Sequence, residues 1–434
     1  MKYYCIGIKG SGMATLAEIL FDLGNEVSGY DDYKDYKFTE DGLDKRNIKI
    51  YYDSNHDIDK DTIVTYSKAF SLEHPEIVRA KNMNLKFIEY NELLGMLSRE
   101  FKTISVCGTH GKTTTCKMIS NILNNTIGCN YFIGDGSGHA NKKNELFVLE
   151  SCEYKKHFLS YRPYYAVVTN IELEHTECYK DIDEIIKTFE EFSNKAKEVI
   201  ACGDDLNVRK MKLNNKVIYY GFNDNNDVVA KNVKLSKEGS SFDVYMNEKF
   251  YGHFEIPVFG NHMVLNSLAC ITVCNLQKID KEEIHRLFHT FTNAKRRFKE
   301  KVFKDIVTID DYAHHPTEIK VTIESARQKY PDKEIVAVFL PNTYSRTKAL
   351  MNDFIDVLKL ADKAYVMDIH CDRERKEDYP NVSSDELIKN IPGAEKISID
   401  TVDKLLRHKN AAICFMSCTN IYEILEAYQK LLSE

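Results

Sequence analysis

Short apolar runs of strand type alternate with amphipathic helical segments along most of the chain. Near the start, YYCIGI predicts a strand, and KGSGMATLAEILFDLG predicts a glycine turn that leads into a helix. The apolar residues of this helix recur at helical spacing, and Gly24 ends it. The next run, NEVSGYDD, predicts a second strand with acidic residues at its end. This strand–turn–helix–strand order is the outline of a nucleotide-binding α/β fold.

The same alternation continues through three blocks, at residues 1–98, 99–295 and 296–434. In the second block, KTISVCG predicts a strand and KTTTCKMISNILNN a helix, and residues 240–274 predict a hairpin followed by a helix. In the third block, a predicted strand ends in Asp310 and Asp311, and Pro316 suits the first turn of the next helix. We therefore expect an α/β protein of three domains.

Composition and charge exclude several classes of protein. The 434 residues are 43% hydrophobic and 29% charged, which is typical of a globular protein with ample core. The net charge of −7 argues against nucleic acid or an anionic membrane surface as a partner, and no apolar run is long enough to span a membrane. The N-terminus has no secretory signal pattern. Monomer and homodimer both stay open.

The 12 cysteines are scattered, and none forms a CxxC pair. Cys270 and Cys274 are four residues apart, as are Cys414 and Cys418, and on a helix this spacing gives one apolar face. We therefore expect buried thiols in a cytoplasmic protein, without zinc or disulfides.

The stretch SVCGTHGKTTT contains the ending of a phosphate-binding loop, Gly111-Lys112-Thr113. The usual pattern places a glycine where this chain has Val106, and here Gly108 comes two residues later. The glycines nevertheless lie between a predicted strand and a predicted helix, where helix amides face phosphates. We expect a nucleotide site in which Lys112 neutralises phosphate charge and Thr113 contacts Mg²⁺. The alternative is a glycine-rich turn with a solvated lysine.

Two further candidates lie at strand ends. Glu150 ends the run LFVLE, and His175 follows the run YAVVTNI. Ligands gather at the carboxyl ends of parallel strands, and Mg²⁺ prefers oxygen ligands. Glu150 is therefore the expected partner of Thr113, and His175 would contact a second cation. Each residue alone is also compatible with an ordinary surface or core role.

The N-terminal glycine turn contains Gly7, Gly10 and Gly12. The dinucleotide fingerprint would need a glycine in place of Lys9, so this pattern is weak support for NAD. A tight strand-to-helix turn explains the pattern better, and the amides at the helix start could still hold a diphosphate.

Six motifs, taken together, resemble the Mur ligase family in order and spacing over the whole chain: GIKGSGM, GTHGKTTT, TNIELEH, KRRF, DDYAHHPTE and NTYSRT. The resemblance implies a Rossmann-like UDP-sugar-binding domain at 1–98, a P-loop ATPase domain at 99–295 and a Rossmann-like ligase domain at 296–434. It also implies an ATP- and Mg²⁺-dependent ligase of cytoplasmic peptidoglycan precursor synthesis. Its substrates would be UDP-N-acetylmuramate and L-alanine, joined through an acyl phosphate.

The resemblance also implies residue roles. The UDP diphosphate would lie on Gly10, Ser11 and Gly12, with Asp31 at the uridine end. His314, His315 and Arg346 would lie near the muramate carboxylate or the amino acid. The ATP site would comprise Gly108, Thr109, His110, Gly111, Lys112, Thr113, Thr114, Asn266, Arg297 and, at the ribose, Asp311. The catalytic group would be Lys112, Thr113, Glu150, His175, His315 and Arg346, with Thr113, Glu150 and His175 holding metal.

The chain departs from the family pattern in four places. Met263 replaces an asparagine, Asn342 replaces a histidine, Cys152 stands where many members have aspartate, and FMSCTNIYE replaces a glycine-rich loop. Three alternatives stay open. A ligase that recycles a tripeptide onto the same sugar would share these motifs, and a UDP-sugar dehydrogenase would use the N-terminal glycines for NAD. The departures at Met263 and Asn342 leave room for a nucleotide-sensing protein without catalysis.

Overall fold

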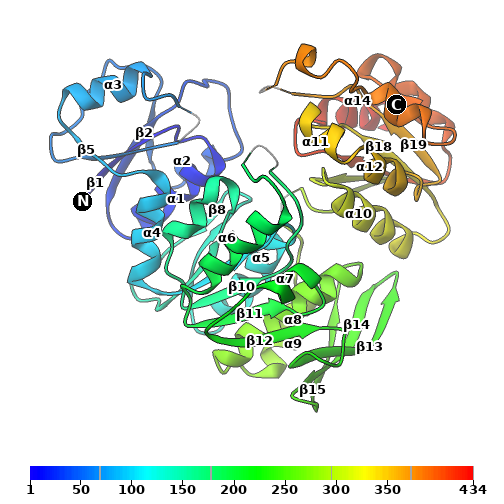
Figure 1. Ribbon diagram of the computed structural model, residues 1–434. Coiled ribbons are helices and arrows are strands. Elements are labelled where there is room, and N and C mark those ends of the chain that lie inside the picture. Colours follow the sequence, from blue (N-terminus) through cyan, green and yellow to red (C-terminus); the bar gives the residue numbers. More distant parts are fainter. Residues whose placement is uncertain (68–69, 176–177, 295, 372–373, 434) are drawn as a thin grey trace. The chain divides into compact units, whose positions relative to one another are not determined.

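The computed structural model describes residues 1–67, 70–175, 178–294, 296–371 and 374–433 (Figure 1). Contacts within the chain define two compact units. The first unit contains residues 1–231, 244–252 and 265–288, and the second contains residues 232–243, 253–264 and 289–434. The described residues form three sheets, and each of the three predicted blocks contains one of them, so the predicted α/β fold is confirmed.

The first sheet is parallel and has the strand order β3-β2-β1-β4-β5. The predicted strand, glycine turn, helix and second strand are all present, and Gly24 follows the helix with a positive φ of 78°. The elements are β1 (Lys2–Ile6), α1 (Ser11–Asp22), β2 (Glu26–Tyr30), α2 (Glu40–Asp44), β3 (Lys49–Tyr51), β4 (Ile63–Tyr66), α3 (Pro75–Asn82), β5 (Lys86–Phe87) and α4 (Tyr90–Glu100).

The second sheet has ten strands in the order β15-β14-β13-β12-β11-β10-β6-β9-β7-β8. The interior strand β6 pairs in parallel with β9 on one side and β10 on the other, so the loops that follow these three strands meet at one edge. The strands are β6 (Lys102–Cys107), β7 (Asn130–Ile133), β8 (Ser137–His139), β9 (Leu146–Glu150), β10 (Tyr165–Val168), β11 (Glu198–Cys202), β12 (Lys216–Gly221), β13 (Val228–Ser236), β14 (Gly239–Met246) and β15 (Lys249–Ile256).

Six helical segments accompany this sheet, and they include the predicted helix after the phosphate loop and the predicted helix after the hairpin. They are α5 (Lys112–Asn124), η1 (Tyr154–Ser160), α6 (Ile182–Ser193), α7 (Leu206–Lys210), α8 (Asn261–Leu276) and α9 (Lys281–His289). One hydrophobic core joins the first sheet to the second, since Leu16 of α1 belongs to the same buried cluster as Phe147 of β9 and Phe158 of η1. Arg46 reinforces this junction by donating to the carboxylate of Asp22, the last residue of α1, and to the Gly138 carbonyl of β8.

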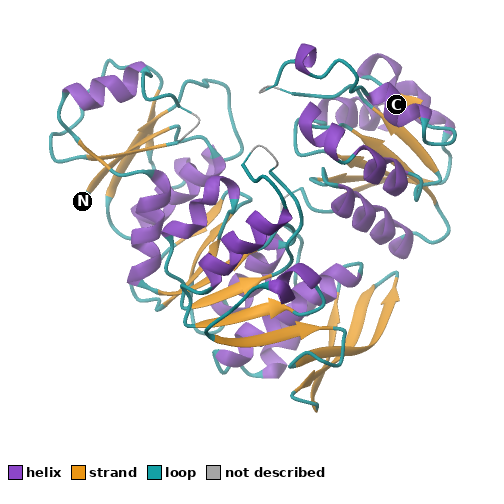
Figure 2. Ribbon diagram, viewed as in Figure 1, coloured by secondary structure: helices purple, strands orange, loops and turns teal. Residues whose placement is uncertain are grey.

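The third sheet has the order β16-β17-β21-β18-β19-β20, and only the edge strand β16 pairs antiparallel among these described strands. Helices cover both of its faces (Figure 2): α10, α12 and α13 pack over one buried cluster, and η3 and α14 over another. The elements are β16 (Lys299–Phe303), β17 (Ile306–Asp311), α10 (Pro316–Lys329), β18 (Glu334–Phe339), α11 (Tyr344–Ala349), α12 (Met351–Leu358), β19 (Lys363–Val366), η2 (Lys376–Asp378), α13 (Ser384–Lys389), β20 (Glu395–Lys396), η3 (Ile399–Arg407), β21 (Ala411–Met416) and α14 (Tyr422–Ser433).

The cysteines are free, and eight of the twelve are buried. Cys270 and Cys274 lie on α8 with their sulfurs 4.0 Å apart, as their spacing predicted. The same interpretation is wrong for the second pair, because Cys414 lies in β21 and Cys418 follows the end of that strand. A four-residue spacing within a buried parallel strand looks the same in the sequence as one on a buried helix.

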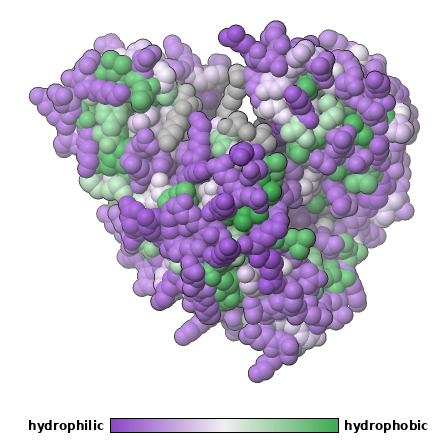
Figure 3. Space-filling model, viewed as in Figure 1, coloured by the Kyte–Doolittle hydropathy of each residue, from purple (hydrophilic) through white to green (hydrophobic). Residues whose placement is uncertain are grey.

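Polar residues dominate the face of the molecule that Figure 3 shows, and the apolar residues there are scattered among them. Among the described residues, no helix has both the length and the apolar character that crossing a membrane requires.

Candidate active site

The glycine turn after β6 has a backbone that only glycine adopts with ease. Gly108 has φ of 141° and Gly111 has φ of 81°, both in the region that favours glycine. A side chain at Gly108 would overlap the Thr169 hydroxyl, and one at Gly111 would come within 2.9 Å of the Asn266 side-chain oxygen. Val106 is fully buried within β6, so the position of the usual first glycine belongs to the strand. The predicted strand–turn–helix context is confirmed, and Asn266 lies at the turn.

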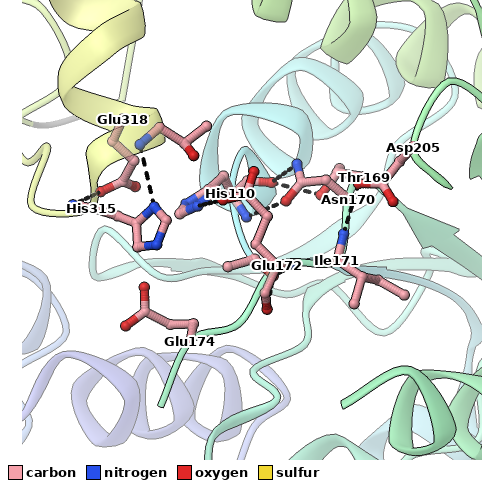
Figure 4. A network of polar contacts seen from close by, with 12 residues as sticks. His110, Thr169, Asn170, Ile171, Glu172, Glu174, Asp205, His315 and Glu318 are labelled. Atoms are coloured by element: carbon pink, nitrogen blue, oxygen red, sulfur yellow. Dashed lines mark hydrogen bonds and ion pairs between the residues drawn. The ribbon is translucent and has the colours of Figure 1, made fainter. Parts of the chain in front are cut away.

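The loop that follows β10 fixes this turn in place (Figure 4). The His110 N–H donates to the Asn170 side-chain oxygen at 2.8 Å, and its carbonyl accepts from the Asn170 amide at 3.0 Å and from the Thr169 hydroxyl at 2.6 Å. The Glu172 N–H donates to the Thr109 hydroxyl at 2.8 Å. The turn is therefore held in shape before any ligand arrives, which lowers the entropy cost of binding an anion there.

Asp205 holds the loop that follows β10. It caps α7, with its Oδ1 accepting from the Asn207 and Val208 N–H groups at 2.8 and 2.9 Å, and its Oδ2 accepts from the Ile171 N–H at 3.1 Å. Burial raises the pKa of Asp205, and these backbone donors partly offset that rise. The sequence analysis did not select Asp205; the only local signal is an aspartate directly before a short helix.

Lys112 forms a buried ion pair with Glu153, another residue that the sequence analysis did not select. The Lys112 Nζ lies 3.0 and 2.9 Å from the two Glu153 carboxylate oxygens, and it also donates to the Thr109 carbonyl at 3.0 Å and to the Gly108 carbonyl. Burial lowers the pKa of Lys112, but the charge and hydrogen bond of Glu153, together with the nearby Cys152 and Glu150, outweigh burial, and the net shift is upward. Burial raises the pKa of Glu153, but Lys112 and His175 hold it below its usual value. Both groups are therefore charged at neutral pH.

Thr113, at the start of α5, and Glu150, at the end of β9, lie together, as the sequence analysis expected. The Thr113 hydroxyl donates to Glu150 Oε1 at 2.8 Å, and the Gly134 N–H donates to Glu150 Oε2 at 2.6 Å. Two oxygens this far apart can be adjacent ligands of one octahedral Mg²⁺, because ligands at 2.0–2.1 Å and at right angles lie roughly 2.9 Å from each other. The oxygen pair therefore fits the ion that the sequence predicted.

His175 lies near the lysine–glutamate pair. Its Nε2 is 3.6 Å from Glu153 Oε1, and its ring packs edge-on against Tyr154 with the centroids 5.0 Å apart. Residues 176–177 directly after it lie outside the described residues. The structure thus gathers His175, Glu150 and the phosphate loop at one end of the sheet, and the metal role of His175 stays a prediction.

The glycine turn after β1 is organised by Lys9, which occupies the place of a fingerprint glycine. The Lys9 side chain is buried: its Nζ donates to the Tyr33 and Asp35 carbonyls, each at 2.8 Å, and pairs with Glu40 at 2.7 Å. Asp31 accepts the Lys9 N–H at 2.9 Å and the Tyr33 N–H at 3.1 Å. Asp31 therefore fixes the loop beside Gly10, Ser11 and Gly12, where the sugar nucleotide was expected.

In the second unit, Asp311 ends β17 and organises the loops around it. Its carboxylate accepts the Phe298 N–H at 2.8 Å and the Ala313 N–H at 2.9 Å. Burial raises its pKa to about 6, although Arg297 opposes that shift. Burial and the positive charge of Arg297 also lower the pKa of His262 to about 4.

His314 and His315 lie at the start of α10. His315 is the N-cap residue, with its Nδ1 accepting the Thr317 N–H at 3.3 Å, and Pro316 takes the first helical position as predicted. Glu318 accepts the N–H groups of His314 at 3.0 Å and His315 at 3.4 Å (Figure 4). Glu318 also lies 3.3 Å from Arg297, so this residue, which was not selected from the sequence, holds three of the predicted site residues.

The remaining predicted residues lie on separate loops of the second unit. Arg346 belongs to the short helix α11 after β18, where its guanidinium donates to the Asn342 carbonyl at 3.3 Å. Arg296 donates to the carbonyls of Ser417 at 2.9 Å and Thr419 at 3.2 Å. These contacts hold the FMSCTNIYE loop, which replaces the family's glycine-rich loop. Lys295 of the KRRF motif lies outside the described residues.

Comparison with known proteins agrees with this geometry. Three family models match in succession: one described as Mur ligase family, catalytic domain, at residues 2–102; Mur ligase middle domain at 106–274; and Mur ligase, glutamate ligase domain, at 296–414.

Solved structures match over the full length. UDP-N-acetylmuramate–alanine ligase MurC from Thermotoga maritima is 25% identical, with a TM-score of 0.81, covering 100% of this chain and 99% of that one. A murein peptide ligase from Psychrobacter arcticus is 21% identical with a TM-score of 0.72, covering 100% and 99%. A pseudomurein peptide ligase type C from Methanothermus fervidus is 19% identical with a TM-score of 0.69, covering 99% of each chain. The phosphate loop of this chain lies beside a threonine–glutamate oxygen pair, and all three domain models match in succession. The protein therefore belongs to the Mur ligase family of ATP-dependent amide-forming enzymes.

Proposed function

We propose that this protein joins L-alanine to the carboxylate of UDP-N-acetylmuramate, using ATP and passing through an acyl phosphate. The observation that carries the proposal is the convergence of Lys112, Thr113 and Glu150 on the rigid turn after β6. The full-length similarity to the alanine ligase of Thermotoga maritima supports the choice of substrates. The KRRF and DDYAHHPTE motifs support the same choice.

The reaction requires an arrangement of this kind because amide formation from a carboxylate in water is unfavourable. The carboxylate becomes reactive when it attacks the γ-phosphoryl group of ATP, and that step brings two anions together. Lys112 and the free amides at the start of α5 would stabilise the negative charge of the transition state. A Mg²⁺ ion held by Thr113 and Glu150 would further neutralise the phosphate oxygens.

The contacts of Lys112 determine the position and the charge of its ammonium group. Two backbone carbonyls of its own loop, at Gly108 and Thr109, fix the position of its Nζ, and Glu153 keeps the charge stable in a buried setting. To contact a phosphate, the ammonium group has to exchange one of these acceptors. We propose that it gives up a carbonyl and keeps Glu153, because the carboxylate is the stronger acceptor.

The sugar nucleotide would bind at the turn Gly10–Gly12, within the same unit as the ATP loop. The core shared by α1 and the second sheet, together with the Arg46 contacts to Asp22 and Gly138, fixes the separation of the two turns. The amine of L-alanine would then attack the acyl phosphate and displace phosphate. His314, His315 and Arg346 are the residues proposed for the acid and amino-acid substrates.

The test is ATP-dependent release of phosphate. The proposal predicts release only when ATP, Mg²⁺, UDP-N-acetylmuramate and L-alanine are present together, with UDP-N-acetylmuramoyl-L-alanine as the product by mass spectrometry. Release that requires a tripeptide in place of L-alanine would identify a recycling ligase. ATP binding without release under either condition would identify a nucleotide sensor.

The dehydrogenase alternative has less support than the ligase. The buried Lys9 side chain takes the place of the second fingerprint glycine, and the Lys9 backbone is bonded to Asp31, which the fingerprint would need for a ribose. An NAD-dependent absorbance change with a UDP-sugar would reinstate that alternative. A panel of glycine, L-serine and L-alanine in the phosphate assay would define the amino-acid preference.

A further inference from the structure

Tyr90 lies beside the turn proposed for the sugar nucleotide, and neither the motifs nor the proposed mechanism uses it. It is the first residue of α4, the helix that leads from the first sheet to the second. Its ring packs against the core that α1 shares with the second sheet. Its hydroxyl lies so close to Gly12 that a side-chain carbon at Gly12 would come within 2.5 Å of the phenol oxygen. The Tyr90 hydroxyl therefore takes the space that a side chain at position 12 would fill.

The hydroxyl faces the open end of α1. Gly10 is the N-cap of this helix and Gly12 its second helical residue, so the N–H groups at this end have no carbonyl one turn earlier. Because the Cα–Cβ bond of a helical residue tilts toward the N-terminus, the point occupied by the hydroxyl lies on the side from which a diphosphate would approach. The phenol oxygen therefore lies beside the first turn of α1, whose amides would face the diphosphate.

Other contacts hold Tyr90 in this position. The next residue, Asn91, donates its side-chain amide to the Ser160 hydroxyl at 2.9 Å, and a side-chain carbon at Gly95 would come within 2.5 Å of the Ser160 carbonyl. The helix α4 is thus packed closely against η1 of the second sheet's domain. This packing fixes the position of α4, from which the phenol projects.

The chemistry of the phenol suits a hydrogen-bond donor. Burial raises the pKa of Tyr90, and the nearby Cys152 and Glu150 raise it further, so the hydroxyl keeps its proton. No partner for this hydroxyl exists among the described residues, although the side chain is half-buried. A half-buried donor without a partner is well placed to serve a ligand.

We propose that the Tyr90 hydroxyl donates a hydrogen bond to the diphosphate of the UDP-sugar on the Gly10–Gly12 turn, which makes Tyr90 a substrate-binding residue. The inference rests on the proposed function, because that function places the sugar nucleotide at this turn. It adds a contact from α4, so the diphosphate would contact both the start of α1 and the start of α4.

The experiment is calorimetric binding of UDP and of uridine to Tyr90→Phe. A hydrogen bond to a charged group is lost, so the affinity for UDP should fall about tenfold, while the affinity for uridine, which has no phosphate, should not change. Tyr3→Phe is the matched control: Tyr3 lies near the amino end of β1 in the same core, and its hydroxyl contacts the Met1 sulfur. It should bind UDP as the wild type does.

Two further measurements separate binding from a merely structural role. In the phosphate-release assay, Tyr90→Phe should raise the KM for UDP-N-acetylmuramate about tenfold while kcat stays within about twofold. Gly12→Ala should weaken UDP binding by displacing the phenol. The loss of UDP affinity caused by Gly12→Ala should be smaller in the Tyr90→Phe background, which lacks the hydroxyl oxygen.

The outcomes distinguish this inference from the proposed function. A wild-type enzyme that turns over, combined with unchanged UDP affinity in Tyr90→Phe, would overturn the Tyr90 contact alone. A wild-type protein that binds no UDP and releases no phosphate would overturn both. A fall in kcat without a change in UDP affinity would also exclude the proposed contact.

Discussion

The chain contains two strand–glycine turn–helix units, one in each of its first two sheets, and each contains a buried lysine. The turn after β1 has Gly7 at a φ of 83°, and the turn after β6 has Gly108 at 141° and Gly111 at 81°. In each, the lysine is paired with a glutamate, Lys9 with Glu40 at 2.7 Å and Lys112 with Glu153 at 2.9 Å. Composition and local geometry are thus alike.

The two lysines differ in what else they contact. Lys9 donates to the carbonyls of Tyr33 and Asp35, which belong to the loop after the neighbouring strand β2. Lys112 donates to carbonyls of its own turn, at Gly108 and Thr109. Lys9 therefore fixes one loop to another, whereas Lys112 remains within the turn where phosphates are expected. This difference in partners favours Lys112 over Lys9 as the lysine that would contact a phosphate.

The largest effect is expected at the second turn. Lys112→Ala removes the charge proposed to act on the γ-phosphoryl group, so phosphate release should fall at least about a thousandfold. Calorimetric binding of UDP should stay within about twofold of the wild type, because that site belongs to the other turn. A loss of UDP affinity as large as the loss of phosphate release would contradict the assignment of ATP to the second turn and UDP to the first.

At the first turn we expect a loss of folding stability and an effect on UDP binding alone. Lys9→Met leaves Glu40 without its cation and the Tyr33 and Asp35 carbonyls without a donor, so urea denaturation should show a loss of roughly 3 kcal/mol. The affinity for UDP should fall, and the KM for ATP should not change. Lys34→Met, on the same loop and exposed, is the control. An increase in the KM for ATP alone would show that the two lysines have the same role.

Glu150→Ala tests the oxygen pair beside the second turn. Removing one of two proposed ligands should raise the Mg²⁺ concentration for half-maximal phosphate release about tenfold. Glu184→Ala is the control, since Glu184 forms an ion pair with Lys156 elsewhere in the same domain. An unchanged Mg²⁺ titration would remove Glu150 from the metal site.

The smallest effect concerns acid pH. Because the pKa of Glu153 is lowered in the folded protein, its contribution is complete above the unfolded pKa of a glutamate and is lost as the pH falls through the lower folded value. Urea denaturation should therefore show Glu153→Gln to be less stable than the wild type at pH 7. That difference should shrink by about 1 kcal/mol or more at pH 3.5. A difference that stays constant between these pH values would show that the carboxylate charge is not what stabilises Lys112.

The fold and the two turns could be predicted because their signals are local. Apolar periodicity marked β6 and α5, and the glycines between them marked the turn. Glu150 was predicted because a strand end is visible in the sequence and carboxylates suit Mg²⁺. Lys9 was noticed only as a departure from a fingerprint, since nothing nearby in the sequence indicates that its charge is buried against Glu40.

The residues that were missed act through distant contacts. Glu153 pairs with Lys112 across 41 positions, Asp205 reaches Ile171 across 34, and Glu318 reaches Arg297 across 21. Each is a polar residue near a helix start, a position that acidic side chains take for capping alone. Only the folded arrangement shows that these carboxylates also hold the loops of the site.

The most direct test of the whole account is a crystal structure with a non-hydrolysable ATP analogue, Mg²⁺ and UDP-N-acetylmuramate. The account predicts triphosphate density on the amides of residues 108–113, with Lys112 at the γ-phosphate, and the UDP diphosphate on Gly10–Gly12. A triphosphate on the first turn, or an empty second turn at saturating analogue, would contradict it.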